Sequence, residues 1–166
     1  MRSGKTAINN SMKIEDVLIE AGGEPIYYFA YGMLTDPEIM RGAKFVGAAQ
    51  LDNYRFTFRK FANVEQSGGD TVDGVLWELP TDMIRDLDRV EGYPNMYGRK
   101  TVPVFTMNGQ RYEAWVYYMT PATIQWTEED RMPTNQYIRT ILNGYRHAGI
   151  TPQQINDAYY EIFNSY

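Results

Sequence analysis

The feature that most restricts the fold of this chain is a change of hydrophobic period near Thr134. Before this residue, apolar side chains come mainly in short runs rich in aromatic and β-branched residues, which are typical of strands and are separated by glycine-containing turns. After it, they recur with the 3.6-residue period of helices, first in Tyr137, Ile138, Ile141, Leu142 and Tyr145 and then in Ile155, Ala158, Tyr159 and Ile162. The pattern predicts an α+β domain whose short, glycine-bent strands curl into a small barrel closed by the C-terminal helices.

The strand signals lie in the first two thirds of the chain. Gly74 marks a bulge or a close approach of two backbones, and residues 65–70, EQSGGD, read as a loop. Asn108 and Gly109 suit a type I′ turn between two strand-like flanks. The sequence therefore predicts strands at 26–31, 54–60 and 71–79 and a hairpin over 101–119.

Two helices are predicted within this strand-rich part. The first is short and follows Thr35 or Asp36 as N-cap, with Pro37 near its first position. The second runs from Thr81 to Val90 and ends against Gly92.

Length and composition indicate one globular domain. A chain of 166 residues with 43% hydrophobic and 22% charged residues buries roughly 70% of its unfolded surface. We expect residues 25–166 to form this domain, and residues 1–24 to be a flexible extension in which MKIEDVLIEA is a candidate short helix. Because the longest apolar run is only a few residues and the first ten residues lack a signal-peptide core, we expect no membrane span and a cytoplasmic location.

Charge and residue types narrow the chemistry. A formal charge of -5 argues against a nucleic-acid surface, which needs clustered Lys and Arg. The absence of cysteine excludes disulfides, thiolate metal sites and a cysteine nucleophile, and the single histidine, His147, excludes a multi-histidine metal site. Any reaction must therefore rely mainly on carboxylates, hydroxyls and backbone amides.

Glu91 is the candidate catalytic residue. In the helical projection it falls within about 20° of Ile84, on the side where Ile84 and Leu87 are expected to be buried. A glutamate at a helix end can simply extend into solvent, which is the plainer interpretation. If the phase holds, however, burial without a partner raises the pKa of the carboxyl towards neutrality, as a general acid/base requires.

The strand at 26–31 stops at the bend Tyr31-Gly32-Met33-Leu34. Successive N–H groups there form a candidate nest for an anion, although an ordinary strand-to-helix turn has the same composition. Tyrosines from the turn after Glu91, the predicted hairpin and the C-terminal helix either line a pocket with hydroxyl donors or pack in the core: Tyr93, Tyr97, Tyr117, Tyr118, Tyr137 and Tyr145. The candidate counter-charges for an anionic ligand are Arg99, Arg139 and Arg146.

Four stretches together resemble the gamma-glutamyl cyclotransferase-like proteins, including gamma-glutamylamine cyclotransferases and AIG2-like proteins. They are YFAYGML, DGVLWEL, LDRVEGYPNMYGRKTVPV and PTNQYIRTILNGYRHAGI, and they cover roughly residues 26–150 in the family's order. The resemblance implies a small mixed β-barrel with flanking helices and C-terminal helices packed on the barrel.

The resemblance also implies a reaction that needs no metal or cofactor. The α-amine of a gamma-glutamyl compound attacks its own side-chain carbonyl and releases 5-oxoproline and an amine or amino acid, with Glu91 as general acid/base. The small-molecule substrate would be held by Tyr31, Gly32, Met33, Leu34, Tyr97 and Tyr137. Met33 stands where the family usually has Ser or Thr, so backbone donors would act there without a side-chain hydroxyl.

Two other interpretations remain open from sequence. One is a catalytically inactive protein that retains the pocket and binds a small anionic or amine-bearing molecule. The other is an interaction module whose tyrosine-rich surface docks a partner. Turnover of a gamma-glutamyl compound would support the enzyme, and binding without turnover would support the inactive binding protein. A solvent-exposed Glu91 in a protein that binds no small molecule would support the interaction module.

Overall fold

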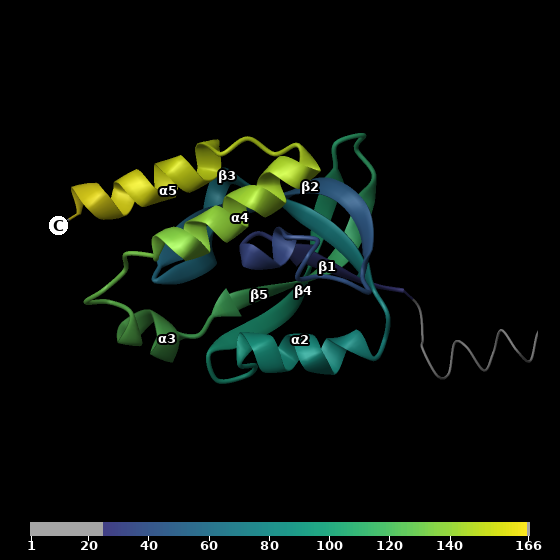
Figure 1. Ribbon diagram of the computed structural model, residues 1–166, viewed down its shortest axis with the longest axis horizontal. Helices are drawn as coiled ribbons and strands as arrows, with labels where there is room; N and C mark the ends of the chain where they lie inside the picture. The colour runs from purple at the N-terminus through teal and green to yellow at the C-terminus, as the bar shows by residue number, and fades with distance from the viewer. Residues whose placement is uncertain (1–24, 166) are drawn as a thin grey trace, which may run out of the picture.

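The computed structural model describes residues 25–165, which form a closed barrel in the strand order β1-β3-β2-β4-β5 (Figure 1). Neighbouring strands are antiparallel, except that β1 pairs in parallel with β5, through Tyr28 and Trp115, and so closes the barrel. The strands are β1 (Ile26–Ala30), β2 (Lys44–Arg59), β3 (Phe61–Leu79), β4 (Tyr97–Thr106) and β5 (Arg111–Met119). The predicted small mixed barrel is confirmed.

Among residues 25–165, four helices flank the barrel: α2 (Met83–Glu91), α3 (Pro121–Trp126), α4 (Asn135–Ala148) and α5 (Gln153–Asn164). Figure 1 shows α4 and α5 together along one side of the barrel and α2 along the opposite side. The predicted apolar stripes face inward, because Ile141, Tyr145, Ile155, Ala158 and Ile162 join the buried cluster of the barrel strands. The prediction that the C-terminal helices pack on the barrel is therefore confirmed. The sequence analysis missed α3.

Helix α2 ends as its sequence predicts. Gly92 adopts the left-handed conformation, with φ 65°, and its N–H donates to Arg89 O. The helix begins at Met83 and includes Glu91, which is one residue longer at its C-terminal end than expected. This shift makes Glu91 the last helical residue and keeps it in phase with Leu87, which is buried.

The short helix predicted after Thr35 or Asp36 is wrong. The chain instead forms a single 3₁₀ turn, η1 (Met33–Thr35), followed by turns through Gly42. Asp36 does act as a cap, but of a turn, because its Oδ1 accepts the N–H of Glu38 at 2.9 Å. Tertiary contacts hold the segment: Trp77 Nε1–H donates to the Leu34 carbonyl at 3.0 Å.

The loop predicted at 65–70 is wrong in part: these residues lie within β3, and Glu65 and Gln66 pair with β2, but 67–70 form an irregularity in the pairing before Thr71. Strands β2 and β3 form one long ribbon whose tight turn lies at Lys60, with φ 67°, between the paired residues Arg59 and Phe61. The polar residues of 65–70 are mostly exposed on this ribbon, which explains why their composition resembles a loop.

Two predictions about glycines have different outcomes. Gly74 is a close-approach point, since a Cβ there would lie 2.6 Å from the Phe29 ring and even nearer to the Ala30 carbonyl. The hairpin between β4 and β5 is present, but its turn is not type I′, because Gly109 has a positive φ of 84° and Asn108 does not. A type I′ turn needs a positive φ at both residues.

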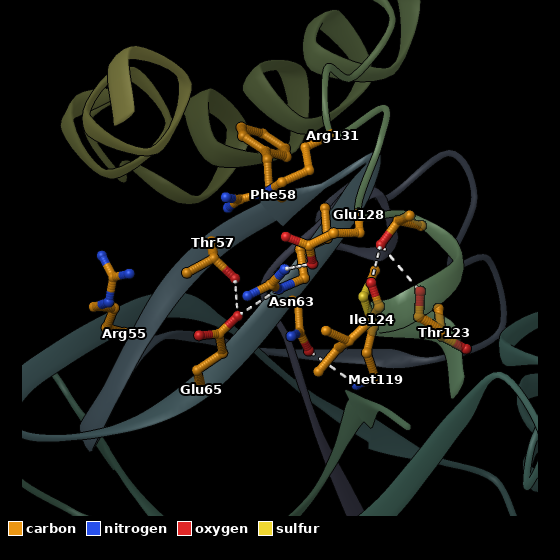
Figure 2. Close-up of polar contacts among 12 residues, drawn as sticks. Arg55, Thr57, Phe58, Asn63, Glu65, Met119, Thr123, Ile124, Glu128 and Arg131 are labelled. Carbon is orange, nitrogen blue, oxygen red and sulfur yellow. Dashed lines mark hydrogen bonds and ion pairs between the residues drawn. The ribbon is translucent and has the colours of Figure 1, made fainter. Parts of the chain in front are cut away.

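The tip of the β2–β3 ribbon is tied to β5. Figure 2 shows Asn63, from β3, directed at Met119 of β5, whose N–H donates to Asn63 Oδ1 at 2.9 Å. The same view shows Glu65 accepting from Thr57 across the ribbon, at 3.0 Å. These contacts fix the preceding residues, Phe61 and Ala62, which line the candidate site.

The extension predicted for the start of the chain, residues 1–24, lies outside the described residues. Between residues 25 and 165, no helix is both long and apolar enough to cross a bilayer.

Candidate active site

A partly open cavity of about 220 Å³ lies where the end of β1, the tip of the β2–β3 ribbon and the end of α2 meet. All seven residues proposed from sequence line it: Tyr31, Gly32, Met33, Leu34, Glu91, Tyr97 and Tyr137. The other lining residues were not among those proposed: Tyr28, Phe61, Ala62, Val90 and Met96. The structure thus brings together side chains that are far apart in the sequence.

Glu91 is the ionisable carboxyl of this cavity. It is half-buried, and protein atoms crowd the carboxyl closely enough that desolvation raises its pKa to about 7. The Tyr28 hydroxyl, which donates to Oε2 at 3.4 Å, lowers the pKa in part. None of the ion pairs among residues 25–165 includes Glu91. The carboxyl can therefore both accept and release a proton near neutral pH.

Buried and half-buried tyrosines surround this carboxyl and are held by backbone groups. Tyr97 donates to the Ala62 carbonyl at 2.8 Å, and the Ala62 N–H donates to the Tyr137 hydroxyl oxygen at 2.9 Å. Tyr31 donates to the Tyr117 carbonyl at 2.5 Å. Burial raises the pKa of Tyr31, Tyr97 and Tyr137, so their hydroxyls stay neutral. Within the described chain the Tyr137 hydroxyl donates to no group, which leaves its proton available to a ligand.

The bend at Gly32 supplies backbone donors. Thr35 and Asp36 donate back to Gly32 and Met33 in the 3₁₀ turn, whereas the N–H groups of Gly32, Met33 and Leu34 donate to no acceptor in the described part of the chain. Gly32 has φ -117°, outside the left-handed region that favours glycine. A Cβ at this position would instead lie 3.0 Å from Ala62 Cβ and 3.5 Å from the Tyr137 hydroxyl. Glycine is thus needed here for space.

Helix α4 holds the bend through hydrogen bonds from residues that do not line the cavity. Tyr145 donates to the Tyr31 carbonyl at 2.6 Å, and Asn143 Nδ2 donates to Asp36 Oδ2 at 3.3 Å. Gly144 lets the helix approach closely, since a Cβ there would lie 2.6 Å from the Thr35 carbonyl carbon and 2.7 Å from Asp36 N. Sequence reasoning missed Gly144 as a positioning residue, although a glycine inside a helical stripe is a recognised signal of close packing.

Several candidates from the sequence lie away from the cavity. Tyr93, Tyr117, Tyr118 and Tyr145 do not line it. The arginines expected as counter-charges do not line it either: Arg99 is paired with Asp88 and stacked on Tyr93 and Trp115, and Arg139 and Arg146 are exposed on α4. The donors that face a ligand are therefore hydroxyls and backbone amides. Among residues 25–165, no three His, Asp or Glu side chains lie close enough together to hold a metal ion.

Comparison with known proteins agrees with this geometry. Residues 28–139 match the family model described as gamma-glutamyl cyclotransferase, AIG2-like. The gamma-glutamylcyclotransferase of Mus musculus is 30% identical over 152 residues, which cover 81% of this chain and 77% of the mouse protein. The Homo sapiens gamma-glutamylcyclotransferase is 30% identical over 144 residues, 76% of this chain and 73% of the human protein. A solved structure of a gamma-glutamyl cyclotransferase superimposes with a TM-score of 0.68 and 25% identity, covering 81% and 86% of the two chains.

Proposed function

Because the chain belongs to the gamma-glutamyl cyclotransferase, AIG2-like family, we propose that it converts a gamma-glutamyl compound into 5-oxoproline and a free amine or amino acid. The observation that carries this proposal is the carboxyl of Glu91. It faces the cavity, forms no ion pair with residues 25–165, and has a pKa of about 7. Within the family reaction, such a group is the one that moves protons.

The first step prepares the nucleophile. The α-ammonium of the substrate transfers a proton to the Glu91 carboxylate, and the resulting amine attacks the gamma-carbonyl carbon of the same molecule. Since Glu91 ionises near neutral pH, it takes this proton and can later return it. Attack closes a five-membered ring. Because the reacting groups belong to one molecule, orientation in the cavity supplies much of the acceleration.

The second step expels the leaving group. As the carbon–nitrogen bond breaks, protonated Glu91 donates to the leaving nitrogen, while the ring nitrogen gives up its second proton. The attacking nitrogen loses two protons in all, and the leaving nitrogen gains two when it departs as an ammonium, so Glu91 returns to its starting state. The free N–H groups of the bend at Gly32 and Met33 are suited to hold the substrate carboxylate or the developing oxyanion.

The test is to incubate the protein with a panel of gamma-glutamyl amines, gamma-glutamyl dipeptides and glutathione, and to measure 5-oxoproline by mass spectrometry. We expect at least one compound to be converted. Replacing Glu91 with Gln removes the ionisable group and is expected to lower kcat by a factor of about 10² to 10⁴, with an unchanged circular dichroism spectrum. The matched control is Glu129→Gln, at an exposed carboxylate remote from the cavity lining, which is expected to retain full activity.

The methionine at position 33 favours a second candidate function, which is binding of a gamma-glutamyl compound without its conversion. With methionine in place of the hydroxyl that the family usually carries, the cavity loses one polar contact but keeps its backbone donors. A protein that binds gamma-glutamyl compounds without converting them would show ligand-induced thermal shifts and no 5-oxoproline with the same panel. That result would replace the enzyme proposal with a binding function.

A further inference from the structure

A hydrogen-bonded chain links α5 to the bend of the candidate site. It runs from the backbone of Asp73, on β3, through the Gln154 amide to the Tyr145 hydroxyl, and from there to the Tyr31 carbonyl. Neither Gln154 nor Tyr145 lines the cavity. We propose that Gln154 is a positioning residue of the site: it fixes the direction in which the Tyr145 hydroxyl donates, and thereby directs the Gly32 N–H into the cavity. This inference rests on the proposed function for its consequence in catalysis.

The orientation of the Gln154 amide is set by one residue. The N–H of Asp73 donates to Gln154 Oε1 at 2.7 Å, and Gln154 Nε2 donates to the carbonyl of Asp73 at 2.9 Å. An amide oxygen only accepts and an amide nitrogen only donates. A flipped side chain would therefore place its NH₂ group against the Asp73 N–H and its oxygen against the Asp73 carbonyl. The NH₂ group therefore lies on the side of Tyr145, to whose hydroxyl oxygen it donates at 2.8 Å.

The hydrogen bond from Gln154 determines which group accepts the hydroxyl proton of Tyr145. Its hydroxyl oxygen accepts from Gln154, so its one proton goes to the other neighbour, the Tyr31 carbonyl at 2.6 Å. Tyr145 is 1% exposed, and burial keeps its pKa above the ordinary value, so the hydroxyl remains a neutral donor. The chain of bonds thus has a defined direction, from the Gln154 amide to the bend.

The direction matters because of the geometry of the peptide group. In a trans peptide the carbonyl of one residue and the N–H of the next point in opposite directions. The Tyr31 carbonyl points to Tyr145, outside the cavity, so the Gly32 N–H points the opposite way. Gly32 lines the cavity and its N–H donates to no acceptor between residues 25 and 165. Tyr145 and Gln154 therefore hold one of the backbone donors that the reaction would use.

The decisive variant is Gln154→Glu at pH 8. It keeps the size of the side chain but replaces the NH₂ donor by a carboxylate oxygen, which competes with the Tyr31 carbonyl for the Tyr145 proton. We expect kcat/KM to fall by roughly tenfold, which is the effect of one lost neutral hydrogen bond. A rise in KM would show that the Gly32 N–H holds the substrate carboxylate, and a fall in kcat would show that it holds the oxyanion. Both results support the proposal.

A double-variant cycle separates positioning from general destabilisation. Tyr145→Phe is expected to lower kcat/KM by a similar factor, and adding Gln154→Glu to Tyr145→Phe is expected to cause no further loss, because the hydroxyl through which Gln154 acts is gone. The control Asn156→Asp makes the same amide-to-acid change at an exposed position of α5 and is expected to stay within twofold of the wild type. Additive losses, or wild-type activity in Gln154→Glu, would overturn the proposal.

The Gly32 amide resonance tests the contacts of Gln154 and Tyr145 without any measurement of catalysis. The nitrogen of Gly32 and the carbonyl of Tyr31 belong to one conjugated peptide group, so loss of the bond from Tyr145 is expected to move the Gly32 amide resonance in a ¹⁵N-correlated NMR spectrum. The same displacement is expected in Tyr145→Phe and Gln154→Glu, and none in Asn156→Asp. A Gly32 resonance that stays in place would disprove the chain of contacts, whereas a wild-type protein that forms no 5-oxoproline would disprove only the proposed function.

Discussion

Gly32 shows how one missing side chain shapes the cavity. Its φ of -117° lies outside the left-handed region, and Gly32→Ala is expected to fold with a loss of about 1 to 3 kcal/mol in the free energy of unfolding. The added Cβ, however, would lie 3.0 Å from Ala62 Cβ and 3.5 Å from the Tyr137 hydroxyl. We expect kcat/KM to fall at least tenfold because the substrate and the methyl group compete for this space, as steady-state kinetics will show.

The matched control for this change is Gly68→Ala. Gly68 has open space around its Cα and no positive φ, so the substitution is expected to leave both activity and stability unchanged. If Gly32→Ala also retained wild-type kinetics, the bend would not be part of the substrate site.

At the residue scale, local periodicity predicted the position of Glu91 but not its surroundings. Helical phase alone placed Glu91 beside buried Leu87, because both belong to one short, regular helix. Tyr28 reaches Glu91 across 63 residues of sequence, and no local signal indicates such a contact. The expectation for Arg99 failed for the same reason: its ion pair with Asp88 depends on how β4 lies against α2.

At the scale of elements, the packing of α4 on η1 depends on Gly144. Ala is normally favoured over Gly inside a helix by about 1 kcal/mol. Here, a Cβ would lie 2.6 Å from the Thr35 carbonyl carbon, which is backbone and cannot rotate aside. We therefore expect Gly144→Ala to destabilise the protein by roughly 1 to 3 kcal/mol and to lower activity, as measured by urea unfolding and by 5-oxoproline formation.

An exposed position of the same helix provides the comparison. Arg139, whose exposed side chain donates to Gln136 on the same helix, can be changed to Ala with an expected effect within about 0.5 kcal/mol. A Gly144→Ala protein that is more stable than the wild type would show that helix propensity outweighs the contact with η1.

The elements that the sequence did not predict correctly are those defined by tertiary contacts. Residues 35–43 carry the composition of a helix start, but the bond from Trp77 to the Leu34 carbonyl and the approach of α4 hold the chain as the 3₁₀ turn Met33–Thr35, which is followed only by turns. Residues 65–70 carry the composition of a loop but lie within β3: Glu65 and Gln66 pair with β2, and 67–70 form an irregular stretch before pairing resumes at Thr71. In contrast, the ends of α2 and α4 follow local rules, with a left-handed glycine after each.

For the molecule as a whole, burial of Glu91 makes stability depend on pH. Desolvation raises the pKa of Glu91 from 4.5 to about 7 in the folded state. Between these pH values the folded protein keeps a proton that the unfolded chain has lost. The stabilisation is therefore fully present below about pH 4.5, decreases as the pH rises to about 7, and changes no further above it. The slope is about 1.4 kcal/mol per pH unit, or roughly 3 kcal/mol in total.

This dependence is measured by urea unfolding from pH 4.5 to 8. Glu91→Gln is expected to lack the contribution, so its stability relative to the wild type should increase by roughly 3 kcal/mol over that range. Glu129→Gln, at an exposed carboxylate, should follow the wild type throughout. Parallel curves for Glu91→Gln and the wild type would mean that the carboxyl is hydrated in the folded protein.

The barrel closes where β1 meets β5, and the polar contacts of the site cross similar spans of sequence: 75 residues from Ala62 to Tyr137 and 114 from Tyr31 to Tyr145. A nascent chain cannot form these contacts until α4 has left the ribosome, and refolding must bring distant segments together before they gain any stabilisation. The return of enzymatic activity should therefore trail the return of secondary structure during refolding, which makes turnover a reporter of the last steps of assembly.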